Sequence, residues 1–230
     1  MINGRTIAVI IPALNEESSI GLVLDEMPTE MDRIIVIDNG STDTTADIAR
    51  SKGATVVREP HRGYGAACLR GIAALKSAPP DVILFCDADH SDHPDDALKI
   101  ASVVCSGSAQ MCIGSRVLGE REHGALTPQQ IFGNWLATTL IRWRWGMRFT
   151  DLGPLRAITW QLLTEMAMED KTWGWTVEMQ IKAARMNTSV VELPARYRRR
   201  IGQSKISGTL VGSAKAGYKI LLTIGRYAIR

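Results

Sequence analysis

The sequence repeats a short run of β-branched and aliphatic residues, a turn rich in Asn, Asp, Gly or Pro, and a stretch with helical periodicity. In the first half of the chain this rhythm predicts strands at residues 6–11, 33–37, 55–58, 81–86 and 110–114. It predicts helices near residues 18–26, 43–52, 65–76 and 95–104. Because parallel strands need helical crossovers, we expect an α/β fold, a three-layer α/β/α sandwich with a mostly parallel central sheet.

The second half follows a different pattern. It predicts a long helix over residues 129–145, two further helical stretches, a strand at 189–193, a basic loop and a final amphipathic helix. No linker rich in Gly, Ser or Pro separates the halves, so we expect a single domain over residues 1–230. Its expected parts are residues 1–123, 124–207 and 208–230.

Composition excludes several protein classes. Hydrophobic residues make up 45% and charged residues 22%, which is ordinary for a folded protein and argues against disorder. The formal net charge is 27 − 24 = +3, too small for bulk attraction to nucleic acid, and we expect no nucleic-acid partner.

The cysteines and the apolar segments bear on the compartment. The four cysteines form no CxxC pair and lie in apolar stretches, which favours reduced thiols and a cytoplasmic location. The apolar run at residues 7–11 is too short for a signal peptide or a membrane span. The final apolar segment is interrupted by Lys215, Lys219 and Arg226, so we do not expect it to cross a bilayer.

Acidic and amide side chains follow three of the predicted strands. The first strand runs into Asn15 and Glu16, the second into Asp38, and the fourth into Asp87 and Asp89. Single turns of this kind are often helix caps. Three that converge on the carboxyl edge of one sheet, where ligands of such sheets bind, indicate a functional site instead.

The two carboxylates of Asp87-Ala88-Asp89 follow the most apolar strand. Carboxylates combined with water and substrate phosphates suit Mg²⁺ or Mn²⁺, so we expect a metal at Asp87 and Asp89. His90 and His93 offer a zinc alternative, although structural zinc sites normally use four N or S ligands and no cysteine is adjacent.

Several segments together resemble glycosyltransferase family 2, whose members have the GT-A nucleotide-sugar fold. They are IPALNEE, DNGSTDTT, HRGYGAA, DADHSDHPDD and GSR. Three later segments are similar to the dolichyl-phosphate mannose synthase branch and its bacterial polyprenyl-phosphate relatives: GNWLATTLIRWRWGMRFTDLGPLRAI, TWGWTVEMQIKAA and YRRRIGQSKISGT. The resemblance implies nucleotide-sugar binding in residues 1–123 and acceptor binding in residues 124–207.

The resemblance also implies roles for individual residues. Donor-binding residues would be Pro12, Ala13, Asn15, Glu16, Asp38, Asp87 and Asp89, the last two also at the metal. Phosphate-binding residues would be Arg116 and, in a basic loop that closes over phosphate, Arg199 and Lys205. The sugar and acceptor pocket would contain Asp151 and Arg156. The catalytic residues would be Asp89, Asp151 and Arg116.

The expected reaction moves a hexose from UDP- or GDP-hexose to polyprenyl phosphate or a similar membrane-associated acceptor, with inversion. A divalent ion and arginines would stabilise charge on the leaving diphosphate. A phosphate acceptor needs no strong base, whereas a hydroxyl acceptor would need one, with Asp151 the leading candidate.

Two positions differ from the family pattern. Ser91 stands where Gln is frequent, so water or Asp92 would replace a side-chain ligand. Residues 129–131 read Gln-Gln-Ile where lipid-phosphate enzymes often carry Arg. A soluble hydroxyl acceptor therefore stays an alternative, as does an inactive nucleotide-sugar-binding module.

Two helical segments combine basic and aromatic residues. Lys215, Lys219, Arg226 and Arg230 fall close to one helical stripe, which is typical of a helix that lies on an anionic membrane surface. The earlier helix carries Trp135, Trp143 and Trp145 with Arg142, Arg144 and Arg148. These helices predict contact with the inner face of the membrane, and the alternative is packing against the domain or against a second subunit in a homodimer.

Overall fold

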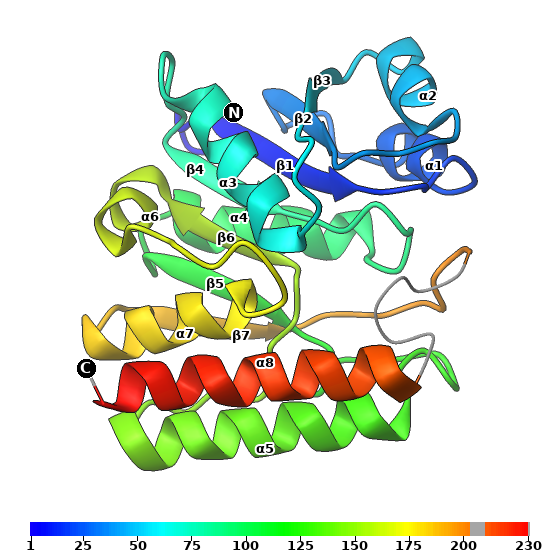
Figure 1. Ribbon diagram of the computed structural model, residues 1–230. Coiled ribbons are helices and arrows are strands. Elements are labelled where there is room, and N and C mark those ends of the chain that lie inside the picture. Colours follow the sequence, from blue (N-terminus) through cyan, green and yellow to red (C-terminus); the bar gives the residue numbers. More distant parts are fainter. Residues whose placement is uncertain (203–209, 230) are drawn as a thin grey trace.

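The computed structural model describes residues 1–202 and 210–229 (Figure 1). Its sheet has seven strands in the order β3-β2-β1-β4-β6-β5-β7. The strands are β1 (Ile7–Ala13), β2 (Arg33–Asp38), β3 (Thr55–Arg58), β4 (Val82–Phe85), β5 (Met111–Ser115), β6 (Arg156–Thr159) and β7 (Val190–Pro194). Only β6 runs antiparallel to its neighbours β4 and β5. The α/β fold with a mostly parallel sheet is confirmed.

Helices cover both faces of this sheet. They are α1 (Ile20–Asp25), α2 (Thr45–Ser51), α3 (Tyr64–Leu75), α4 (Pro94–Cys105), α5 (Pro128–Trp145), α6 (Trp160–Met166), α7 (Trp175–Arg185) and α8 (Leu210–Ile229). Strand β1 shows why helices must cover both faces of the sheet. Ile7 and Val9 pack in one core with α1, α2 and α4, while Ala8 and Ile10 pack in the other with α3, α6 and α7. A strand whose successive side chains are all buried reads as a continuous apolar run.

Strand β6 is the element that the sequence pattern missed. It is short, it begins with the fully buried Arg156, and it lies between β4 and β5, so that strands from both halves of the chain share one sheet. The proposed division at residues 123 and 207 stays a prediction.

Helices α5 and α8 lie side by side and run in the same direction (Figure 1). In α8 the basic stripe that was predicted to face a membrane is partly paired with protein, whereas Lys215 is exposed. Lys219 Nζ is 2.9 Å from Asp170 Oδ2, and Arg226 Nη2 is 3.4 Å from Glu169 Oε2. Both acids belong to the segment between α6 and α7, so this part of the stripe contacts protein. Arg230 lies outside the described residues.

No helix among residues 1–202 and 210–229 is long and apolar enough to cross a membrane.

Candidate functional site

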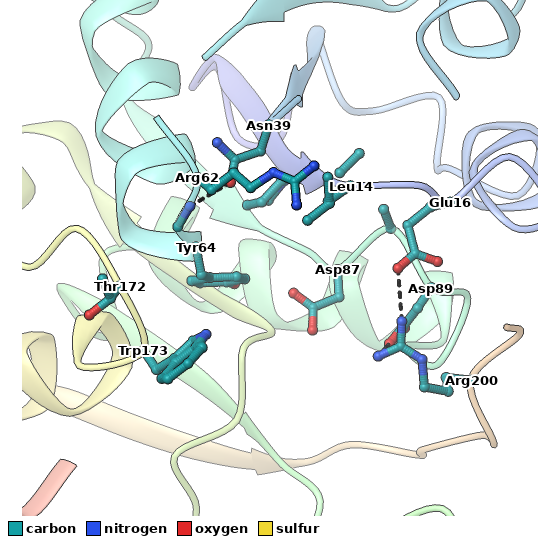
Figure 2. A pocket seen from close by; sticks show the side chains of 14 residues that line it. Leu14, Glu16, Asn39, Arg62, Tyr64, Asp87, Asp89, Thr172, Trp173 and Arg200 are labelled. Carbon is teal, nitrogen blue, oxygen red and sulfur yellow. Dashed lines mark hydrogen bonds and ion pairs between the residues drawn. The ribbon is translucent and has the colours of Figure 1, made fainter. Parts of the chain in front are cut away.

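The carboxyl ends of β1, β2 and β4 open into a cavity of about 540 Å³. Five of the predicted site residues line it: Pro12, Ala13, Glu16, Asp87 and Asp89. Figure 2 shows the Asp87 carboxylate between Tyr64 and Trp173 on one side and Glu16, Asp89 and Arg200 on the other. The acidic residues after β1 and β4 therefore meet at one cavity as the sequence predicted, whereas the acid after β2, Asp38, does not line it.

Two predicted donor residues lie behind the cavity wall rather than in it. The Asp38 carboxylate accepts the Ser41 N–H at 2.9 Å, and Asn15 Oδ1 accepts the Thr42 N–H at 2.8 Å. Neither side chain lines the cavity. Asn15 joins the turns after β1 and β2, and Asp38 holds the turn after β2, while their contact with a donor stays a prediction.

Asn39, one residue beyond Asp38, lines the cavity instead. Its amide donates to the carbonyls of Glu59 and His61 at 3.1 and 2.8 Å, and its Oδ1 accepts the Gly63 N–H at 2.7 Å. These bonds fix the segment that places Arg62 in the cavity wall.

The acidic cluster after β4 contains a third carboxylate, Asp92. Burial, then the charges of Asp89 and Asp92, raise the pKa of Asp87 well above its ordinary value. Burial, then the charge of Asp89, raise the pKa of Asp92 to about 7. Crowded carboxylates of this kind are stabilised by a cation.

These residues fit a divalent ion. Within the described part of the chain, Asp87 Oδ1 is buried without a hydrogen-bond partner. The Asp89 carboxylate is oriented by the Ser91 N–H, which donates to Oδ1 at 3.0 Å. No group of three or more His, Cys, Asp or Glu side chains forms a metal cluster among those residues. Two carboxylates that leave room for water and phosphate suit Mg²⁺ or Mn²⁺ better than a closed protein cage.

The other predicted ligands at this turn point away from the cavity. Asp92 Oδ2 accepts the Asp87 N–H at 3.4 Å. His90 Nε2 is 2.9 Å from Glu26 Oε1. Asp92, His90 and His93 line a separate cavity of about 10 Å³, so the geometry does not favour the zinc alternative.

The basic loop contributes Arg200 to the cavity, not the predicted Arg199. Arg200 Nη2 is 2.8 Å from Glu16 Oε1, and Arg200 Nη1 is 3.2 Å from Asp89 Oδ2. The Arg199 side chain instead donates to the carbonyl of His123 at 2.6 Å. Neighbouring side chains of an extended segment point in opposite directions, so only one of the two can face the site. Lys205 lies outside the described residues.

An aromatic wall, which sequence reasoning missed, faces the acidic cluster. It consists of Tyr64, at the start of α3, and Trp173, on the segment before α7. The N–H of Gly65 donates to the carbonyl of Thr172 at 3.1 Å. A Cβ on Gly65 would lie 2.0 Å from the carbonyl oxygen of Asp170, so only glycine permits this approach. In the sequence, the two glycines of HRGYGAA are the feature that could have indicated this close approach of two backbone segments.

A second cavity, of about 290 Å³, adjoins the first. Both are lined by Tyr64, Asp87, Asp89, Trp173 and Arg200. The second continues to Arg116 and to the amino-terminal halves of α5 and α8. The site is therefore two connected chambers with the acidic cluster at their junction.

Arg116 and Asp151 are joined in a buried ion pair beside this chamber. Arg116 Nε and Nη2 donate to Asp151 Oδ2 and Oδ1, each at 2.7 Å. Burial lowers the pKa of Arg116, but the Asp151 carboxylate outweighs it and holds that pKa above its usual value. Arg116 lines the cavity, whereas Asp151 is 0% exposed and does not. Asp151 is therefore placed to hold Arg116, not to receive a proton from a ligand.

Arg156 is also placed differently from the acceptor contact predicted for it. Its side chain is 0% exposed and donates to the carbonyls of Leu152, Gly153 and Thr176. Burial lowers its pKa to about 10. Arg156 braces the turn behind the chamber and lines neither cavity.

Comparison with known proteins shows the family. The profile of glycosyl transferase family 2 matches residues 8–189. The chain belongs to this family.

Relatives of this glycosyltransferase match along most of its length. An uncharacterised glycosyltransferase of Mycobacterium tuberculosis is 34% identical over 218 residues, covering 91% of this chain and 94% of the relative. The undecaprenyl-phosphate mannosyltransferase of Micrococcus luteus is 32% identical over 224 residues, covering 90% of each. The predicted resemblance to the polyprenyl-phosphate branch is confirmed at this level.

A solved structure matches the fold of the glycosyltransferase. Glucosyl-3-phosphoglycerate synthase from Mycobacterium tuberculosis, crystallised with Mn²⁺ and UDP-glucose, has a TM-score of 0.77 and 25% identity. The match covers 98% of this chain and 79% of that one. The predicted GT-A fold is confirmed.

Proposed function

We propose that this glycosyltransferase moves a hexose from UDP- or GDP-hexose to polyprenyl phosphate or a similar membrane-associated acceptor, with inversion at the anomeric carbon. One observation carries the proposal: two chambers meet at Asp87, Asp89 and Arg200, and the second contains the paired Arg116. The larger chamber, at the strand ends, would take the nucleotide. The smaller would take the acceptor, so the sugar would lie at the junction.

We propose Mg²⁺ or Mn²⁺ as the cofactor. Asp87 and Asp89 would hold it, and it would supply positive charge to the departing diphosphate. Support comes from the partnerless Asp87 oxygen and from the solved relative, which contains Mn²⁺ with UDP-glucose.

Arg200 and Arg116 have separate tasks in this proposal. Arg200 borders both chambers and would donate to the diphosphate as negative charge develops there. Arg116 would bind the acceptor phosphate, with its guanidinium oriented by Asp151. The phosphate oxygen would attack the anomeric carbon while the bond to the diphosphate breaks. An acceptor that is already anionic gives up no proton, so Asp151 acts here as a positioning residue.

Tyr64 and Trp173 would form the wall against the transferred sugar, since both border the junction. An aromatic face attracts positive charge, which develops on the sugar ring during transfer. The amide of Asn39 and the side chain of Arg62 would lie farther along the donor chamber.

Two names among the relatives support a phosphate-bearing acceptor. The Micrococcus luteus enzyme is named for undecaprenyl phosphate, and the solved synthase is named for 3-phosphoglycerate. For location, we propose the cytoplasmic side of a membrane, supported by four free, buried cysteines.

A soluble hydroxyl acceptor is the second candidate. Gln129 and Gln130 line the acceptor chamber where a lipid-phosphate enzyme often carries Arg, and amides can bind a hydroxyl group. This candidate would need a base, and the ion pair leaves Asp151 poorly placed for that role.

The test is a donor and acceptor matrix. UDP- and GDP-hexoses are incubated with Mn²⁺ and with a short-chain polyprenyl phosphate, 3-phosphoglycerate or the matching polyprenol. We expect product with one donor and the polyprenyl phosphate. Product with only the polyprenol or a soluble hydroxyl compound would transfer support to the second candidate. Absence of turnover and hydrolysis with every donor would favour the inactive binding module.

A further inference from the structure

Helices α5 and α8 present large apolar side chains to solvent. On α5, Phe132, Trp135 and Trp143 are 60%, 58% and 84% exposed. On α8, Tyr218, Leu222 and Ile229 are 69%, 51% and 91% exposed. In each helix these residues follow a spacing of three, four or seven to eight residues, so they form one stripe per helix. We call the two stripes the α5–α8 face.

An ion pair and a hydrogen bond fix which side of α8 is outward. Lys219 is paired with Asp170, whose side chain is 7% exposed, and the Tyr227 hydroxyl donates to the buried carboxylate of Glu178 at 2.9 Å. These contacts, together with the buried Ile224, hold one side of α8 against the segment before α7 and against α7 itself. The side of α8 that carries Tyr218, Leu222 and Ile229 is therefore outward, and Lys215 and Arg226 are exposed as well.

The charges that α5 and α8 themselves carry are all positive, and Glu169 of the segment between α6 and α7 pairs with Arg226. The sequence contains no Asp or Glu between Glu122 and Asp151, and none after Glu192. Arg142, Arg144 and Arg148 are exposed on and just after α5. A second copy of the chain meeting this face would bring like charges together, which opposes association. An anionic surface would be attracted to it.

The acceptor chamber opens at the same two helices. Its lining includes Gly133 of α5 and Ala216, Gly217 and Ile220 of α8. A Cβ built on Gly133 or Gly217 meets no atom within 4 Å among the described residues, so there is open space along both helices. The chamber leads from there to Arg116 and Arg200.

We propose that the α5–α8 face lies in the interfacial layer of an anionic lipid bilayer. Its Trp, Tyr and aliphatic side chains enter the boundary between headgroups and acyl chains, and its arginines contact the anionic headgroups. This proposal rests on the proposed function, in which the acceptor is a membrane-borne phosphate. The α5–α8 face would bring that phosphate directly to the chamber between α5 and α8. Attachment therefore depends on apolar side chains first and on charge second.

The experiment is flotation of the full chain with vesicles of phosphatidylcholine, with or without about 30 mol% phosphatidylglycerol. The double variant Trp143→Ser/Ile229→Ser should lower partitioning to the anionic vesicles by roughly tenfold or more. Leu22→Ser, an exposed apolar position on α1, is the matched control and should leave partitioning unchanged. Lys219→Gln should also leave it unchanged, because Lys219 faces Asp170.

A second measurement locates the contact. Brominated acyl chains should quench tryptophan fluorescence in the unmodified protein, and Trp143→Phe should lose much of that quenching. Unmodified protein that never floats with anionic vesicles would overturn the proposal. So would a dimer in solution that the Trp143/Ile229 variant dissociates, because the face would then belong to a second copy.

Transfer to a water-soluble, short-chain polyprenyl phosphate keeps the two proposals distinguishable. Transfer without vesicle binding would contradict only the proposal that the α5–α8 face lies in a bilayer. Vesicle binding without transfer to any lipid phosphate would contradict the proposed acceptor, and the proposal for the α5–α8 face would stand.

Discussion

Arg116 and Asp151 form a buried ion pair in which Nε lies 2.7 Å from Oδ2 and Nη2 lies 2.7 Å from Oδ1. The Arg116 backbone N–H also donates to Oδ2, at 2.8 Å. A carboxylate held this way orients the guanidinium that faces the acceptor chamber.

Asp151→Asn should therefore destabilise the fold by about 3 kcal/mol, because removing one charge leaves the other buried and uncompensated. Urea unfolding measures this loss. The variant should also raise the KM for the acceptor. An unchanged unfolding midpoint, combined with the loss of the acidic limb from the pH–rate profile, would restore Asp151 as a general base.

Asp89→Asn should abolish Mn²⁺-dependent turnover while the fold persists. The substitution removes charge from a site that would hold one divalent ion, and the Ser91 N–H can still donate to the amide oxygen. Titration calorimetry with Mn²⁺ and thermal unfolding measure the two effects. Equal Mn²⁺ affinity in variant and parent would contradict the metal assignment.

Arg200→Ala and Arg199→Ala form a matched pair from one loop. Arg200 borders both chambers, whereas Arg199 donates to His123 outside them. Loss of a charge-assisted contact costs about 1.5 to 3 kcal/mol, so Arg200→Ala should lower kcat/KM for the donor by about 10- to 150-fold. Arg199→Ala should change it much less. The opposite ranking would return the phosphate-binding role to Arg199.

The Asp96–Arg196 pair gives a pH prediction. Burial raises the pKa of Asp96, but hydrogen bonds from the Arg196 side chain and backbone outweigh it, so that the pKa is lowered. A carboxyl whose folded pKa lies below its unfolded value stabilises the fold above the unfolded pKa, about 3.9, and loses that contribution as pH falls through the folded pKa.

Asp96→Asn should therefore lower the unfolding free energy at pH 7, and the difference from the parent should shrink as the pH falls below about 4. Urea unfolding across this range measures the difference. A gap between variant and parent that is independent of pH would show that the lost contact is not ionic.

Local sequence determined the sheet and its acidic edge. The strands β1, β2 and β4 are apolar on both faces, and a run of that kind can only be buried between two layers of helices. Glu16, Asp87 and Asp89 come directly after such strands, so chain connectivity alone brings them to one edge. The family resemblance added the expected donor and acceptor halves.

Strand β6 could not be found in this way. Its four residues begin with Arg156, whose guanidinium is satisfied by carbonyls from the 152–153 turn and from Thr176. A charged residue does not fit the apolar pattern by which buried strands are predicted from sequence. The carbonyls that satisfy Arg156 become its neighbours only when the chain folds.

Only the tertiary structure decided which member of a local group faces the site. Arg199 and Arg200 are chemically equal in the sequence, and the course of the loop aims one at Asp89 and the other at His123. Likewise, the basic residues of α8 predicted one outward stripe, but Lys219 is paired with Asp170, and the apolar Leu222 and Ile229 are exposed instead. Periodicity defines the faces of a helix, and the elements packed against the helix determine which of these faces is buried.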